Sequence, residues 1–152
     1  MDLEQLTPIQ IVETYKADVE KLSHYQAYLE KMAGQLTAST FNQEGIQEHS
    51  LSFPVYDSNL LQFIKEAENT KFMDSNYPYI YSRNRIKTAE DEKNLIARCT
   101  VQNMDILGGI LSKYVLKGRV KGAIWSEGVK NGVFLAILLK MQEIIHFWES
   151  NA

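Results

Sequence analysis

The stretch between residues 77 and 87 concentrates aromatic and basic side chains at a regular spacing. They occupy every second position: Tyr77, Tyr79, Tyr81, Arg83, Arg85 and Lys87. Alternate residues of a β-strand share one face, and a surface of phenol rings and cations can stack bases and hold phosphates. Nucleic acid and an anionic protein partner are therefore two hypotheses. We favour a third, a loop or edge strand whose tyrosines pack over the core while the cations remain solvated.

Two further positions are candidates for chemistry. Lys117, Arg119 and Lys121 form a basic segment that lacks the Lys-Ser/Thr pair of a phosphate-binding loop. An anion site there, with Arg119 as its binding residue, is a secondary hypothesis. Glu127 lies close to Trp125 among apolar residues and glycines. Such surroundings can raise a carboxyl pKa and suit acid–base work, so a site near these two residues is our hypothesis for an enzyme.

Other catalytic and metal-binding patterns are missing from the sequence. The three histidines, His24, His49 and His146, each stand alone without a second ligand at metal-binding spacing. Ser126 lacks one glycine of a nucleophile elbow. Cys99 lies on an apolar stripe, which favours a buried, inert thiol. We therefore predict no catalytic residue, no metal and no cofactor.

Charge is distributed unevenly along the chain. The 152 residues carry a formal net charge of −3, with 45% hydrophobic and 23% charged residues, which is typical of one globular domain. Residues 1–70 carry four basic and eleven acidic groups, whereas residues 83–121 carry nine basic and four acidic groups. This asymmetry can indicate a basic binding face. We favour mutual attraction of the two regions, within one molecule or between two.

Three features of the sequence bear on the cellular location of the protein. A single cysteine excludes an internal disulfide and fits a reducing compartment. The first residues do not resemble a signal peptide. The longest apolar run, Val133 to Leu139, falls short of the roughly 20 residues that span a membrane. We expect a cytoplasmic protein with no membrane partner.

Helical spacing of apolar residues dominates the chain. Thr7 and Pro8 predict the start of a long helix over residues 8–33. Residues 36–56 predict a β or loop segment, with a small two-stranded element near 38–56, and residues 57–149 predict a helical core. Within that core, Gly108-Gly109 interrupts an apolar helical stripe and indicates a point where helices cross closely. The best amphipathic helix runs from Phe134 to Trp148.

The second part of the chain also shows a family pattern. It consists of Phe53-Pro-Val-Tyr-Asp57 leading into Leu61, Phe63 and Ile64, of Phe72-Met73, of the Leu107 to Val115 stripe closing at Arg119, and of Gly128 with Asn131-Gly132. Through these residues, positions 51–147 resemble a family of small uncharacterised bacterial proteins, a domain of unknown function. The resemblance implies a single helical domain and an intracellular bacterial origin, and it implies no activity.

These observations predict one mainly α domain over residues 1–152, with five or six helices and a small two-stranded β element. Our leading hypothesis for function is a non-enzymatic interaction module that binds itself, as a homodimer, or another protein. The alternatives are a nucleic-acid-binding protein that uses residues 77–87, and an enzyme with a site near Trp125 and Glu127.

Overall fold

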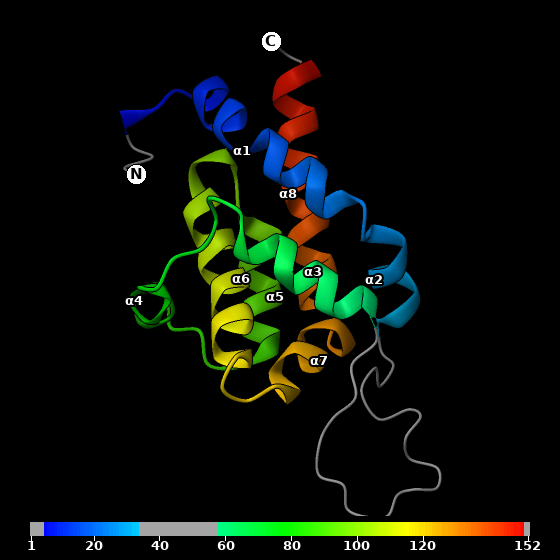
Figure 1. The fold of residues 1–152 in the computed structure, drawn as a ribbon. Helices are drawn as coiled ribbons and strands as arrows, with labels where there is room; N and C mark the ends of the chain where they lie inside the picture. The colour runs from blue at the N-terminus through cyan, green and yellow to red at the C-terminus, as the bar shows by residue number, and fades with distance from the viewer. Residues whose placement is uncertain (1–4, 34–57, 151–152) are drawn as a thin grey trace, which may run out of the picture.

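The computed structural model describes residues 5–33 and 58–150. Within these ranges the chain forms eight α-helices and one 3₁₀ turn, and no strand (Figure 1). The elements are α1 (Pro8–Ser23), α2 (Gln26–Met32), α3 (Ser58–Glu68), α4 (Tyr77–Arg83), α5 (Ala89–Arg98), η3 (Val101–Asn103), α6 (Met104–Gly118), α7 (Ala123–Lys130) and α8 (Val133–Ser150). The mainly helical prediction is confirmed, although the helices exceed the expected five or six. The two-stranded element expected near 38–56 lies outside the described residues.

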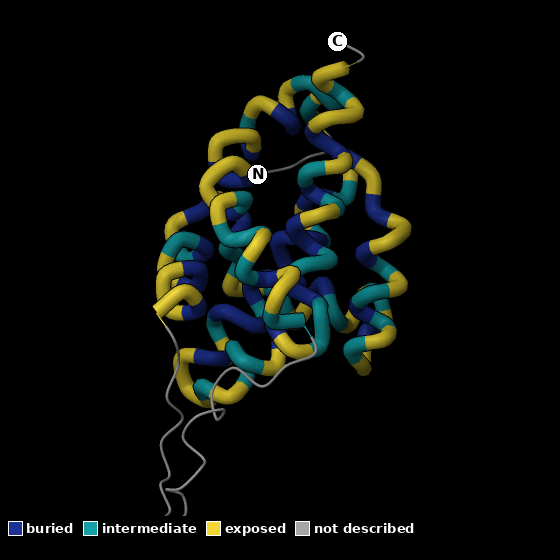
Figure 2. Tube along the Cα trace, turned by 90° about the vertical axis from the view of Figure 1, so that its right-hand side faces the viewer, coloured by how far each residue is buried: buried dark blue, intermediate teal, exposed yellow. Residues whose placement is uncertain are grey.

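Helices α6 and α8 are at the centre of the bundle. All eight helices and η3 contribute buried residues, and along each helix of the described chain buried and exposed stretches alternate (Figure 2). Leu107, Ile110 and Tyr114 of α6, and Ile137 and Met141 of α8, are 0–2% exposed. The stripes read from the sequence on these two helices are therefore core, as predicted. No helix in the described part of the chain combines the length and the apolar character needed to cross a membrane.

The long helix predicted over residues 8–33 is wrong, because the structure divides it into α1 and α2. Tyr25 has φ −101° and ψ 5°, which leaves the helical region. Gln142 of α8 donates hydrogen bonds of 2.8 Å to both Ser23 Oγ and Gln26 Oε1, on either side of the break. The corner lets α2 follow the core instead of projecting into solvent.

The loop or edge strand favoured for residues 77–87 is also wrong over its first part, which forms α4. Pro78 lies in the first turn, where its missing N–H has no partner to lose. Ile80 is buried against Gly109 of α6. Because side chains of a helix share a face every three or four residues, the alternating tyrosines and cations do not line one surface.

The predicted start of the first helix is confirmed, and another segment packs closely at Gly108, although that segment is the connection between α3 and α4 and not a helix. Thr7 and Thr88 each cap a helix through a reciprocal hydrogen-bond pair with the residue three positions on. A Cβ atom added to Gly108 would lie 2.8 Å from the carbonyl oxygen of Phe72. Glycine at this position therefore allows the backbone of the segment before α4 to rest on α6.

Candidate functional site

A buried carboxylate, Glu92 of α5, organises the most polar cluster in the described core. Glu92 is 2% exposed. Its Oε1 accepts a hydrogen bond of 2.5 Å from the hydroxyl of Tyr114, and its Oε2 accepts bonds of 2.6 Å from the hydroxyl of Tyr81 and 3.1 Å from Lys113 Nζ. Tyr81, Glu92, Lys113 and Tyr114 are called the Glu92 cluster below. It joins α4, α5 and α6 at one point.

Lys113 compensates the charge of Glu92 inside this cluster. Its side chain is 21% exposed, against 2% for Glu92. The ammonium lies 4.2 Å from the ring centroid of Tyr114 and 5.5 Å from that of Tyr81, distances at which an aromatic face attracts a cation. A buried carboxylate is costly unless it is paired and hydrogen-bonded, and here both conditions are met.

The two phenols act as hydrogen-bond donors at neutral pH. Burial, followed by the hydrogen bond to Glu92, raises the pKa of both Tyr81 and Tyr114 above the usual phenol value. Ionisation would place a phenolate against a carboxylate in a desolvated site. Both hydroxyls therefore keep their protons and hold Glu92 in place.

This pKa shift predicts alkaline unfolding. The folded protein retains protons that the unfolded chain releases above pH ~10, so stability is fully present below that pH and is lost as pH rises. We expect each phenol to lower the free energy of unfolding by about 1.4 kcal/mol per pH unit above pH ~10. Urea denaturation between pH 8 and 11 measures the slope, and Tyr81→Phe should reduce it. A free energy independent of pH over this range would contradict the shift.

A cavity of about 350 Å³ opens beside the cluster. The side chains of Lys87, Lys117 and Glu127 reach it from three different elements, and all three residues are exposed. Asn131 also lines it and donates a hydrogen bond of 3.1 Å to the hydroxyl of Tyr114. We call this space the Glu92 cavity. It brings together basic, acidic and amide groups next to the hydrogen-bonded side chains of the Glu92 cluster.

The structure brings together four of the residues that the sequence singled out for binding. Tyr81, Lys87, Lys117 and Glu127 line the Glu92 cavity. The other seven do not line it: Tyr77, Tyr79, Arg83, Arg85, Arg119, Lys121 and Trp125. The surface proposed for nucleic acid is thus divided between the helix face directed at Glu92 and an outer face.

Arg119 and Trp125 have structural contacts elsewhere. Arg119 forms an ion pair of 3.0 Å with Glu68, which joins the basic and acidic regions of the chain within one molecule, one of the two forms of attraction expected. The indole of Trp125 donates a hydrogen bond of 3.0 Å to the carbonyl of Val115 and packs against Gly118. Glu127 faces the Glu92 cavity instead. Trp125 and Glu127 therefore do not form a common site.

Sequence reasoning missed Glu92, Lys113 and Tyr114. Glu92 is one of three acids in the first turn of α5, where the helix dipole alone accounts for them, and Tyr114 lies within an apolar stripe of α6. One signal was available: Glu92 precedes buried Ile96 by four residues, so it lies on the inward face of α5. An acid on that face needs partners in the core, but the sequence does not say which.

Other reactive groups in the described residues are inert or isolated. Cys99 is 6% exposed, and burial raises the pKa of its thiol to about 11, in agreement with the expected unreactive thiol. Among the described residues there is no group of three or more His, Cys, Asp or Glu side chains placed to hold a metal ion.

Comparisons with protein-family models, curated proteins and solved structures found no match to this chain. Membership of the uncharacterised bacterial family therefore remains an expectation from residues 51–147.

Proposed function

We propose that this protein is a non-enzymatic binding module that holds a small organic anion in the Glu92 cavity. The observation that supports it is an excess of positive charge at a preorganised wall. Lys113 is neutralised by Glu92, whereas Lys87 and Lys117 line the same cavity without an ion pair to any described residue. Among the residues that line the cavity, Glu127 offsets one of these two charges, and one remains for the ligand.

Binding fits the cluster better than catalysis does. Both oxygens of Glu92 already accept hydrogen bonds, and the two phenols hold their protons. Such a network positions groups rather than exchanging protons with a substrate. Lys113 has ammonium protons beyond the one directed at Glu92 and can donate to a carboxylate or phosphate. Glu127 offers acceptors to a hydroxyl or amino group on the same ligand.

Isothermal titration with inorganic phosphate and a panel of small hydroxy and amino carboxylates tests this proposal. We expect at least one probe to bind, and Lys87→Met with Lys117→Met to weaken it by at least about tenfold, since charge-assisted hydrogen bonds are the strong ones. Lys121→Met is the matched control, because Lys121 is exposed and does not line the cavity. If no probe binds, or if the control loses as much affinity as the double variant, the proposal fails.

Self-association remains a second candidate, supported by the outer face of α8. Phe147 is 57% and Leu139 40% exposed there. Phe147 borders an apolar hollow of about 340 Å³ lined by Val101, Ile144 and Trp148, which a second copy would cover. We expect a solution mass of two chains by light scattering, and of one chain for Phe147→Asp. A wild-type mass of one chain at 100 μM, roughly the upper range of such measurements, would exclude a dimer of useful affinity.

A further inference from the structure

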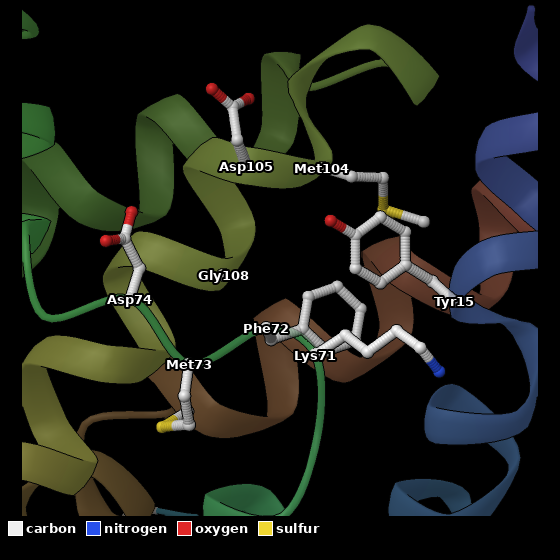
Figure 3. A pocket seen from close by; sticks show the side chains of 8 residues that line it. All are labelled: Tyr15, Lys71, Phe72, Met73, Asp74, Met104, Asp105 and Gly108. Carbon is white, nitrogen blue, oxygen red and sulfur yellow. The ribbon is translucent and has the colours of Figure 1, made fainter. Parts of the chain in front are cut away.

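A second cavity lies on the other side of α6, between α1 and the segment that precedes α4 (Figure 3). Its volume is about 320 Å³. We call it the Tyr15 cavity. It shares no lining residue with the Glu92 cavity, and its chemistry is different because its charged groups are mainly acidic.

Two carboxylates line the Tyr15 cavity, Asp74 and Asp105. Asp74 is held in place from both sides: its backbone N–H donates a hydrogen bond of 2.8 Å to Ser112 Oγ, and its Oδ1 accepts one of 2.8 Å from the backbone of Asn76. Asp105 lies in the first turn of α6 and is exposed. Neither carboxylate forms an ion pair with any described residue.

A buried phenol with no hydrogen-bond partner points into the same space. Tyr15 is 6% exposed, and its ring stacks on Phe72 at a centroid distance of 4.5 Å. Figure 3 shows its hydroxyl directed away from α1 and into the cavity. This hydroxyl bonds to no described residue and belongs to the lining of the cavity. A polar ligand in the cavity can exchange a hydrogen bond with it.

The cation that the chain itself brings to this cavity does not neutralise the carboxylates. The backbone N–H of Lys71 donates a hydrogen bond of 2.8 Å to the buried carboxylate of Asp18. In Figure 3 the Lys71 side chain extends toward α1, away from Asp74 and Asp105. The acidic wall therefore remains available to a ligand.

We propose that the Tyr15 cavity binds a small organic cation, an ammonium or guanidinium group, through Asp74 and Asp105, with the hydroxyl oxygen of Tyr15 as a further acceptor. A carboxylate pair and one phenol suit N–H donors. They do not suit a hard divalent metal, which takes six or more oxygen ligands. Burial, and then the charges of Asp105, Asp18 and Asp74, raise the pKa of Tyr15, so its oxygen belongs to a neutral phenol.

Titration of the ¹⁵N-labelled full chain with n-butylammonium and n-butylguanidinium, followed by NMR, tests this proposal. We expect one or both to shift the amide signals of Asp74, Asp105 and Gly108 in a saturable way. n-Butanol has the same alkyl chain without the charge and should not saturate these shifts. Phosphate, the probe for the Glu92 cavity, should not compete, so the two proposals stand or fall separately.

Three variants locate the binding groups. Asp74→Asn with Asp105→Asn should weaken cation binding by about tenfold or more, since charge-assisted bonds are lost. Tyr15→Phe removes only the hydroxyl and should weaken cation binding several-fold, which corresponds to the loss of about one hydrogen bond. Glu13→Gln, an exposed acid on α1 away from the cavity, should bind as wild type does. Equal binding of n-butanol, tighter binding of Ca²⁺, or unchanged affinity in the double asparagine variant would overturn the proposal.

Discussion

Replacing Glu92 with alanine is expected to lower the free energy of unfolding by about 3 kcal/mol or more. The change leaves Lys113 without its counter-charge and deprives the hydroxyls of Tyr81 and Tyr114 of their acceptor. Breaking a buried ion pair by removing one partner typically costs about 3–5 kcal/mol. The lower end applies here because the side chain of Lys113 is 21% exposed. Urea denaturation at pH 7 measures the loss.

Two further variants separate charge from packing at this position. Glu90→Ala is the matched control, since Glu90 is an exposed acid in the same helical turn, and should change stability by less than about 0.5 kcal/mol. Glu92→Leu with Lys113→Met should recover the part of the loss that comes from the unpaired ammonium, because a buried ion pair can be replaced by apolar residues at little cost. The part that comes from the two hydroxyls should remain, since leucine offers them no acceptor. A single alanine variant as stable as the control would show that the cluster contributes nothing to folding.

Phe134→Ala is expected to cost about 3–5 kcal/mol through the cavity it leaves. Phe134 is 1% exposed, and its ring lies 5.0 Å from that of Phe63 and 5.5 Å from that of Tyr114. It also fills the space over Gly128, where an added Cβ atom would approach it to 2.7 Å. The side chain therefore joins α3, α6, α7 and α8.

Phe147→Ala is the control for this prediction, because the same side chain on the same helix is 57% exposed. It should cost less than about 1 kcal/mol. Because Phe134 contacts Tyr114, the effects of Phe134→Ala and Glu92→Ala should not add, since residues that share a neighbour are usually coupled. Strict additivity would indicate that the ring packing and the Glu92 cluster are independent.

The parts of the fold predicted correctly are those with short-range causes. Thr7 caps α1 because its hydroxyl accepts a hydrogen bond from a donor only three residues away, the backbone N–H of Gln10. The apolar stripe of α8 was read from spacing within one helix, and the core position of its residues followed. The errors arose where a distant segment intervened: Gln142 of α8 holds the corner between α1 and α2, and α6 supplies the surface on which α4 packs.

The sequence by itself determined that this chain is mainly helical, where α1 and α8 begin, and that another segment approaches closely at Gly108, because helix capping and periodicity act within a few residues. Only the tertiary structure decided the sites. Glu92 meets partners 11, 21 and 22 residues away, and Tyr15 reaches a cavity shared with Asp74 and Asp105. A burial pattern indicates that an acid or a phenol faces inward, but which groups meet it there depends on how the helices pack, and no local spacing encodes that.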